Sequence, residues 1–320
     1  MGSGIIVGTW LLWTAAVFMI GVLTLVLAAG LPMESSLQRF QFFLSPSQPS
    51  GVVILLTTFA GLWIGLWLVL KTLHKRPLGT VLSAERRLRL DEFIAGFALA
   101  IVFWLASMSL NLIFLGPPER SRLEFADWVP FLLPLIPLIA MQAASEEMIF
   151  RGYLLQQLAA RFRSPWLWAL LPSLVFGALH YNQSLPGLAP AMYVASTTIF
   201  ALTMVVLVWR TGSISAPIGL HIGVNFFSVG AVGVQGILDG AALWRYRPQS
   251  IETLFFIDLC LVSALLFLVV SSFCPIGRPI PYSRAPGGRP PTGAWRDGND
   301  EAPRAPNPPS PPQPRRSTDL

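Results

Sequence analysis

Two adjacent glutamates and an arginine stand at the end of a long uncharged run. The run WVPFLLPLIPLIAMQAA leads into SEEMIFR, which contains Glu146, Glu147 and Arg151. An ionised carboxylate at membrane depth costs at least about 2.5–3.5 kcal/mol on insertion scales. Glu147 and Arg151 are four residues apart, so they face each other on a helix and are expected to pair, which leaves Glu146 as the freer carboxylate. Charges kept at this cost indicate a functional site.

Polar side chains also interrupt two later apolar segments. His180 ends the sequence FGALH, and His221 and Asn225 lie four residues apart in HIGVN, on one face of a helix. Counted at about 1.5 Å per residue from the basic residues and turns that flank their segments, these side chains and Glu146 reach similar depths. A single intramembrane histidine is equally explained by a helix–helix hydrogen bond. Together with the glutamates, these residues predict one shared polar site.

Such a site has the groups needed to hydrolyse an amide bond. A glutamate and a histidine can deprotonate a water and later protonate a leaving amine, while a second histidine and an asparagine donate hydrogen bonds to an oxyanion. Alternatively, Glu146, His180 and His221 could hold a zinc ion whose bound water attacks. The sequence contains neither HExxH nor GxSxG, so a single-helix zinc motif and a nucleophile elbow are not indicated.

The composition identifies the environment of these residues. The chain has 320 residues, of which 53% are hydrophobic and 12% charged, whereas soluble domains carry about 25% charged residues. This composition predicts a membrane protein that crosses the lipid bilayer several times. The net charge of +6 does not indicate nucleic-acid binding, because the basic residues lie in short loops and a C-terminal tail, as membrane topology requires.

Apolar runs predict an all-α bundle of about eight transmembrane helices around an intramembrane polar cavity. The fifth run is short and polar residues interrupt the seventh. The expected spans are about 5–30, 51–70, 93–115, 128–145, 165–180, 188–209, 213–236 and 253–274. The basic segment KTLHKRPLGTVLSAERRLRL is expected to be cytoplasmic, and an even number of spans then places both termini in the cytoplasm.

The same analysis divides the chain into four regions. Asp258, in the last apolar region, is best explained by an interhelical hydrogen bond, although a buried acid also suits a proton pathway. The last region is rich in Pro, Gly and Arg and is predicted to be a disordered cytoplasmic tail. The regions are N-terminal helices with the basic loop (1–124), a core that contains the three polar motifs (125–235), a last transmembrane helix (236–274) and the tail (275–320).

The three motifs resemble those of a known family. EEMIFR, FGALH and HIGVN resemble the EExxxR, FxxxH and HxxxN motifs of the CPBP intramembrane proteases, which include type II CAAX prenyl endopeptidases and Abi-type bacteriocin-immunity proteins. The resemblance covers roughly residues 125–235. It implies that Glu146 activates water with help from His180, that His221 and Asn225 stabilise the oxyanion, and that Glu147 and Arg151 orient the first motif.

The resemblance also implies a substrate class and leaves alternatives open. The expected substrate is a membrane-anchored protein or peptide, such as a lipidated CAAX-type protein, and both a zinc-dependent and a metal-independent mechanism are considered. The alternatives are a non-catalytic immunity or scaffold member of the family and, less favoured, a transporter that uses the buried acids. The residue usage suggests a bacterial plasma membrane protein.

Overall fold

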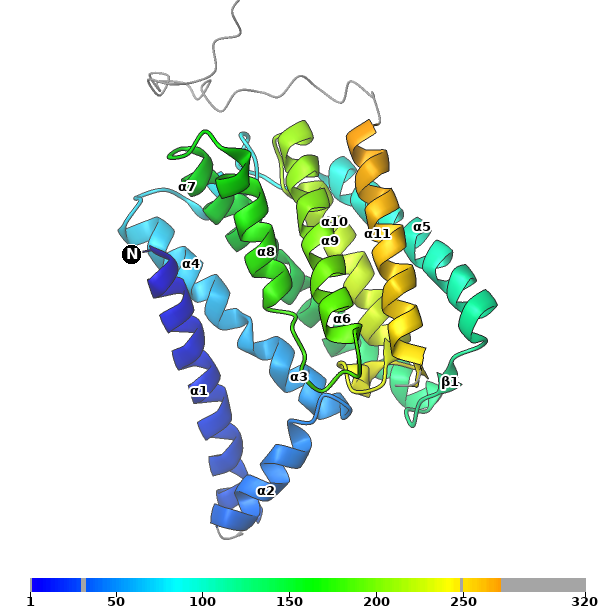
Figure 1. Ribbon diagram of the computed structural model, residues 1–320. Helices are drawn as coiled ribbons and strands as arrows, with labels where there is room; N and C mark the ends of the chain where they lie inside the picture. Colours follow the sequence, from blue (N-terminus) through cyan, green and yellow to red (C-terminus); the bar gives the residue numbers. More distant parts are fainter. Residues whose placement is uncertain (1, 30–32, 248–249, 272–320) are drawn as a thin grey trace, which may run out of the picture. The chain divides into compact units, whose positions relative to one another are not determined.

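The described residues form a helical bundle. The computed structural model describes residues 2–29, 33–247 and 250–271 (Figure 1). Its α-helices are α1 (Gly2–Ala29), α2 (Met33–Phe43), α3 (Pro49–Thr58), α4 (Ala60–Thr72), α5 (Leu90–Leu115), α6 (Phe125–Glu147), α7 (Leu155–Ala159), α8 (Leu171–Ala178), α9 (Ala189–Thr211), α10 (Ser215–Asn225) and α11 (Ile251–Ser271).

These residues belong to one compact unit, Met1–Pro279. The predicted boundaries at residues 124 and 235 lie inside this unit and stay predictions. The predicted tail, 275–320, lies outside the described residues. Helix α2, which is short and amphipathic, lies between the first two expected spans, where the sequence predicted no span.

Six helical stretches in the described part of the chain are long and apolar enough to cross a membrane. They are Gly2–Gly21, Pro49–Thr72, Leu90–Leu115, Phe125–Ala159, Ala189–Thr211 and Ile251–Val270. The polytopic all-α class is therefore confirmed.

The expected count of about eight spans was too high. The fifth expected span contains only the shorter apolar helix Trp166–Ala178. The seventh contains α10, with 11 residues, and the π-helical stretch Phe226–Ala231, with 6 residues, that continues it. At about 1.5 Å per residue, neither covers about 30 Å of hydrocarbon. The seventh apolar run extends beyond the helical part, because the chain leaves the helix after Ala231 and forms a strand.

Helix α10, which carries the HIGVN motif, packs very closely on α5. A Cβ atom added at Gly219 would lie 2.0 Å from the Phe93 carbonyl oxygen, and one at Gly96 would lie 2.1 Å from the Ala216 carbonyl oxygen. A Cβ atom at Gly223 would lie 2.4 Å from the Ala100 Cβ. Small residues spaced by four on both helices allow this approach, as in other membrane helix pairs. The glycines thus set the position of the motif between them.

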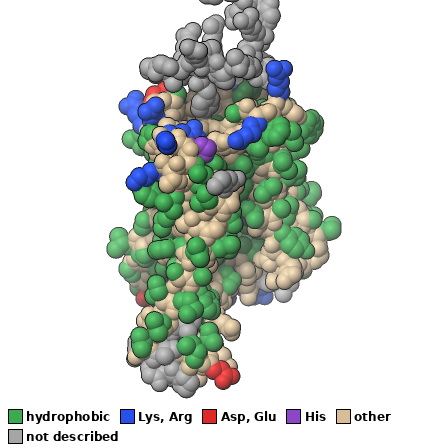
Figure 2. All heavy atoms as spheres, turned by 90° about the vertical axis from the view of Figure 1, so that its left-hand side faces the viewer, with side chains coloured by type: hydrophobic (Ala, Val, Ile, Leu, Met, Phe, Trp, Pro, Cys, Tyr) green, Lys and Arg blue, Asp and Glu red, His purple; other side chains and the backbone are tan. Residues whose placement is uncertain are grey.

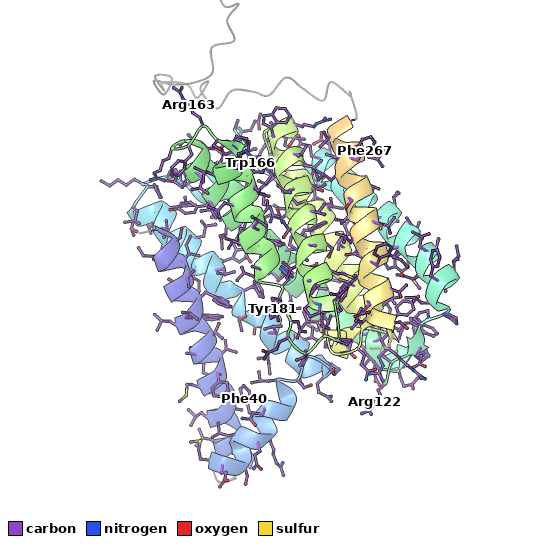
Figure 3. The ribbon with its side chains drawn as sticks, viewed as in Figure 1. Phe40, Arg122, Arg163, Trp166, Tyr181 and Phe267 are labelled. Carbon is purple, nitrogen blue, oxygen red and sulfur yellow. The ribbon has the colours of Figure 1, made fainter. Side chains whose placement is uncertain are left out.

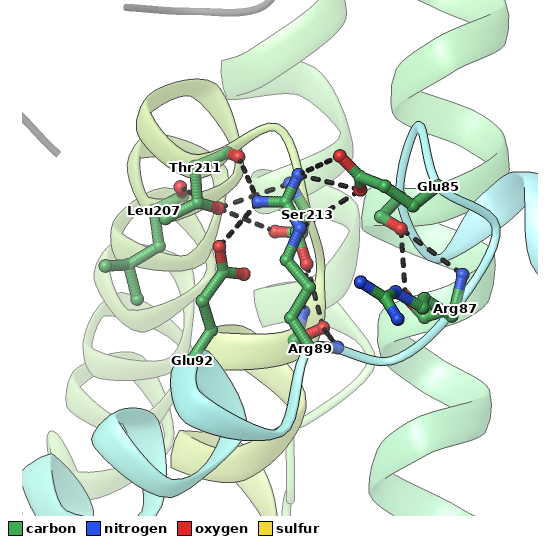
Figure 4. A network of polar contacts seen from close by, with 9 residues as sticks. Glu85, Arg87, Arg89, Glu92, Leu207, Thr211 and Ser213 are labelled. Carbon is green, nitrogen blue, oxygen red and sulfur yellow. Dashed lines mark hydrogen bonds and ion pairs between the residues drawn. The ribbon is translucent and has the colours of Figure 1, made fainter. Parts of the chain in front are cut away.

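Hydrogen bonds tie the start of α10 to the basic segment that precedes α5 (Figure 4). Arg89 donates from Nη1 to the Thr211 carbonyl oxygen at 2.9 Å, and its backbone N–H donates to Ser215 Oγ at 2.9 Å. The Arg89 guanidinium also pairs with Glu85 and with Glu92. This network holds both ends of the α9–α10 turn against the loop.

Three π-helical stretches adjoin the polar motifs. They are η2 (Met148–Leu154), η3 (Trp166–Leu170) and η4 (Phe226–Ala231). Stretch η2 begins directly after Glu147, and η4 begins directly after Asn225. Such π segments are rare and frequently occur at functional sites. Helix α6 also contains Pro130, Pro134 and Pro137, which remove backbone donors from the helix that leads to the glutamates.

A small sheet covers one end of the bundle. Its strand order is β1 (Glu119–Arg120), β3 (Trp244–Tyr246) and β2 (Val232–Val234), with β1 antiparallel and β2 parallel to β3. The short helix η5 (Asp239–Ala241) joins this cap to the loop before α3, because Asp239 accepts hydrogen bonds from Ser47 Oγ at 2.7 Å and from the Gly236 N–H at 2.9 Å. The remaining short helix, η1 (Leu78–Val81), lies in the basic segment.

The surface has the distribution of side chains expected in a lipid bilayer. On the face that carries α1, hydrophobic side chains cover most of the length, and Lys and Arg gather toward one end (Figure 2). Large exposed apolar residues on this and other helices include Leu12, Leu27, Leu133 and Phe267. The described part of the chain is thus a multi-pass helical membrane protein.

Candidate functional site: a polar cluster inside an apolar cavity

The three sequence motifs meet at one cavity of about 840 Å³. Its wall includes Glu146 from the end of α6, His180 from the turn after α8, and His221 and Asn225 from α10. These residues come from parts of the chain up to 79 positions apart, so the helix packing brings them together. Most of the remaining wall is apolar or aromatic.

Glu147 connects two of the motifs. Its Oε1 accepts a hydrogen bond from Arg151 Nη1 at 3.0 Å and lies 2.7 Å from His221 Nδ1. Glu147 is 0% exposed, and Arg151 and His221 are also buried. The expected pairing of Glu147 with Arg151 is therefore present. Because the ionised carboxylate only accepts hydrogen bonds, His221 donates from Nδ1, and its orientation is fixed by this partner.

Glu146 lies on the other side of the same imidazole. Its Oε2 is 3.6 Å from His221 Nε2, and the side chain is 14% exposed. Glu146 Oε2 has no hydrogen-bond partner among the described residues although it is shielded from solvent. Each glutamate has an Oε2 atom without a partner among the described residues, but their environments differ. Glu147 is held by two donors through Oε1, whereas Glu146 lies in the wall of the cavity.

Asn225 is held by a residue that the motifs did not include. Its Nδ2 donates to Gln142 Oε1 at 2.7 Å. Gln142 lies four residues before Glu146 on α6 and also lines the cavity. The sequence could have indicated Gln142 as a site residue, because it is a polar residue inside an uncharged run. Residues four apart share a helix face, so Gln142 and Glu146 point to the same side of α6. The Asn225 amide has a second N–H that this bond does not use.

The sequence placed His180 inside a helix, but His180 lies in the turn after α8. Its Nδ1 lies 2.8 Å from the Phe176 carbonyl oxygen. A carbonyl oxygen can only accept, so Nδ1 carries the hydrogen and Nε2 of the neutral ring is an acceptor. Figure 3 labels the next residue, Tyr181, at the end of α8 that lies away from Arg163. His180 and Glu146 line the same cavity, and in the described structure no hydrogen bond joins their side chains.

Aromatic rings support the cluster from one side. Phe176 has its ring centroid 4.5 Å from the Arg151 guanidinium carbon and 4.8 Å from the His180 ring centroid. Phe200 contacts the His221 ring edge to face at 5.7 Å, and Tyr193 contacts the His180 ring at 5.6 Å. A cation over a ring face gains electrostatic energy that partly offsets its desolvation. Phe176, the first residue of the FGALH motif, also has its ring centroid 6.1 Å from that of His221, so it contacts residues of both other motifs.

The expected zinc ligands all line the cavity. Within the described residues, no group of three or more His, Cys, Asp or Glu side chains is close enough to hold a metal ion. His221 Nδ1 is engaged by Glu147, and His180 Nδ1 is engaged by a carbonyl oxygen. Each ring thus keeps Nε2 free, as metal-ligating histidines also do, so a zinc site of Glu146, His180 and His221 stays a prediction.

Asp258 lines the same cavity from α11, where it faces Ser196 of α9. Ser196 Oγ itself donates to the Tyr193 carbonyl oxygen at 3.1 Å. This placement fits the expected hydrogen bond between two helices. It also puts a further carboxyl group in the cavity that contains Glu146.

The central part of the chain is similar to a known protein family. Residues 128–227 match the family described as type II CAAX prenyl endopeptidase Rce1-like. This segment is Rce1-like. The resemblance based on the three motifs is therefore confirmed, and Glu146, His180, His221 and Asn225 all lie in the Rce1-like segment. At family level, the match supports an intramembrane protease of the CAAX type.

A curated relative extends the similarity outside the Rce1-like segment. The uncharacterized protein YyaK of Bacillus subtilis (strain 168) is 26% identical over 167 residues, which are 51% of this chain and 55% of the relative. The match thus spans about half the length of each protein. No solved structure matches the chain.

Proposed function

We propose that this protein is an intramembrane endopeptidase that hydrolyses a peptide bond of a membrane-anchored substrate. The observation that carries the proposal is the unpaired Glu146 oxygen at the wall of the cavity, 3.6 Å from an imidazole that a second glutamate holds in place. An oriented histidine between carboxylates is the arrangement that general acid–base catalysis requires. The Rce1-like match supports the same reaction class.

In the proposed reaction, Glu146 removes a proton from a water molecule, and the water oxygen attacks the carbonyl carbon. His180 Nε2 accepts a second hydrogen bond from that water and helps to orient it. The proton is shared between Glu146 and His221 Nε2, because Nδ1 of this ring is committed to Glu147. When the carbon–nitrogen bond breaks, the proton passes to the leaving amine.

Asn225 supplies the stabilisation of the developing oxyanion. Its free N–H is available for the negative oxygen, while Gln142 holds the other N–H and fixes the amide plane. A donor placed before the reaction costs no reorganisation when charge develops. His221 adds a second donor once Nε2 has received the proton. Each step uses the chain's own side chains, and none requires a metal ion.

The substrate is proposed to enter from the lipid bilayer. The apolar walls of the cavity suit a hydrophobic or lipidated segment, such as that of a CAAX-type protein, while the polar cluster contacts the peptide backbone. The proposed location is a bacterial plasma membrane with both termini in the cytoplasm, because the basic segment 71–90 is then on the inner side.

The test is cleavage of lipidated and transmembrane peptide reporters by the protein in liposomes. We expect Glu146→Gln to lower the rate at least about 100-fold, the usual contribution of a general base, without loss of folded protein. Asp127→Asn is the matched control, since it removes an exposed carboxylate from the same helix. Each variant is assayed with and without a chelator, and the metal-independent mechanism expects equal rates.

The result also separates the alternatives. Full cleavage by Glu146→Gln would show that this carboxylate is not the base. If the wild-type protein cleaves none of the reporters but binds one of them, the non-catalytic scaffold or immunity alternative is favoured. Proton or solute flux that is lost in Asp258→Asn, without any cleavage, would instead support the transporter.

A further inference from the structure

A second, smaller cavity lies at the end of α4, away from the polar cluster described above. Its volume is about 460 Å³, and its wall is built by Trp67 and Lys71 of α4 and by Lys75 and Arg76 of the following loop, with apolar neighbours between them. No acidic residue lines it. Three cations therefore surround one cavity at the surface of the protein.

These cations are not neutralised by the described part of the protein. Neither Lys71, Lys75 nor Arg76 forms an ion pair with a described carboxylate. The Nε and Nη2 atoms of Arg76 are buried and have no hydrogen-bond partner among the residues that the structure describes. A buried donor without a partner is costly, and an anionic ligand would satisfy it.

The loop that carries the cations is held in a defined shape. The Arg76 N–H donates to the Leu70 carbonyl oxygen at 3.0 Å, and Lys75 has a φ of 51°, which is uncommon for a residue other than glycine. His74 Nε2 lies 3.1 Å from the Tyr153 hydroxyl oxygen, which anchors the loop to η2. The backbone that carries the cationic side chains is thus held in place by the fold.

The electrostatic field around the loop is positive. Burial, together with the charges of Arg76 and Arg161, lowers the pKa of His74 below its usual value. His74 is therefore neutral near pH 7 and does not add charge. Because no described carboxylate balances the cations of the cavity wall, an anion gains Coulomb energy from several residues at once.

The position of the cavity along α4 indicates where the anion comes from. The apolar span Pro49–Thr72 ends inside the cavity wall, and Trp67 and Leu73 beside it are exposed apolar side chains. The Lys71 ammonium lies 4.5 Å from the Trp67 ring centroid. Tryptophan next to basic residues at the end of a span is typical of the headgroup level of a bilayer.

We propose that this cavity binds a phosphate-bearing anion, and that its source is the headgroup of an anionic phospholipid. The Arg76 guanidinium donates hydrogen bonds from Nε and Nη2 to the phosphate oxygens, and Lys71 and Lys75 add positive charge from the sides. The acyl chains of the lipid lie along the exposed apolar surface of α4. This site is independent of the proposed peptidase activity, because it does not share residues with the polar cluster.

The experiment measures lipid binding by the purified full chain in detergent. Phosphatidylglycerol, phosphatidylcholine or inorganic phosphate is added, and bound lipid is counted by native mass spectrometry while the thermal midpoint is followed. We expect phosphatidylglycerol to bind and raise the midpoint, with little effect from phosphatidylcholine or from free phosphate. Arg76→Gln and Lys71→Gln are each expected to weaken phosphatidylglycerol binding at least about fivefold.

The matched control is Arg163→Gln, which removes the same charge from an exposed position that does not line the cavity. Arg163→Gln is expected to bind as the wild type does. Equal losses in Arg163→Gln and Arg76→Gln would overturn the proposal, since binding would then follow total charge. Saturation by inorganic phosphate at the same concentration would overturn the lipid source. Should Arg76→Gln fail to fold, unchanged binding by Lys71→Gln would reject the site.

Discussion

At the scale of single residues, two neighbouring glutamates have different environments. Glu147 is fully buried and shares one oxygen between Arg151 and His221, so its charge is compensated inside the bundle. Glu146 has an oxygen without a partner and faces the cavity. Glu146 therefore faces the space that the proposed substrate would occupy, and Glu147 positions the His221 imidazole that faces Glu146.

The buried ion pair gives a prediction on stability. Arg151→Met removes the cation and leaves the Glu147 carboxylate buried, which is expected to lower the free energy of unfolding by about 3–5 kcal/mol. The double variant Glu147→Gln, Arg151→Met removes both charges and is expected to recover most of this loss. Reversible unfolding in mixed micelles, followed by tryptophan fluorescence, measures both values.

Arg163→Met is the control for this prediction, because Arg163 is exposed (Figure 3). It is expected to change the free energy of unfolding by less than about 0.5 kcal/mol. If Arg151→Met were no less stable than Arg163→Met, the pair would not be compensating a buried charge.

At the scale of elements, the position of the HIGVN motif depends on the contact between α5 and α10. The backbones approach closely at Gly96 and Gly219, and the Arg89 network holds the start of α10 from the other side (Figure 4). His221 and Asn225 lie next to these contacts. The contact between α5 and α10 therefore fixes the positions of His221 and Asn225 in the cavity wall.

Enlarging a contact glycine is expected to disturb both stability and activity. The Cβ atom in Gly219→Ala would meet the Phe93 carbonyl oxygen, a backbone atom that cannot rotate away. We expect a loss of roughly 1–3 kcal/mol in the free energy of unfolding and a lower cleavage rate, because α10 must move relative to α6. Gly8→Ala is the control, since nothing lies within 4 Å of its added Cβ. Equal behaviour of the two variants would contradict a packing role.

At the scale of the whole molecule, the charges at the two ends of the bundle determine its orientation in the membrane. Arg163 and Arg122 lie at opposite ends of the bundle (Figure 3). The end that includes Arg163 also has the basic segment with Lys71, Lys75 and Arg76. By the positive-inside rule, this end is expected to face the cytoplasm.

Thiol labelling tests this orientation in intact cells. In a variant without Cys260 and Cys274, a membrane-impermeant reagent is expected to label Arg122→Cys from outside and to reach Arg163→Cys only after lysis. The reverse pattern would mean that the basic end faces outward, and the lipid site would then lie in the other leaflet.

Much of the fold and site could be predicted from the sequence. Runs of apolar residues predicted the spans, because crossing hydrocarbon requires both length and hydrophobicity. The predicted number of spans was too high because of α8 and α10, where apolar residues continue outside the helix. The length of an apolar run therefore overstates the length of the helix. Spacing by four correctly paired Glu147 with Arg151, since that contact lies within one helical turn.

The sequence by itself determined which residue types are buried in the membrane and which of them share a helix face. Only the tertiary structure decided that His221 contacts Glu147 and that Gln142 holds Asn225. These two contacts join residues 74 and 83 positions apart. The physical reason is that helical periodicity fixes local geometry, whereas contacts between helices depend on how closely their surfaces pack, here through Gly96, Gly219 and their neighbours.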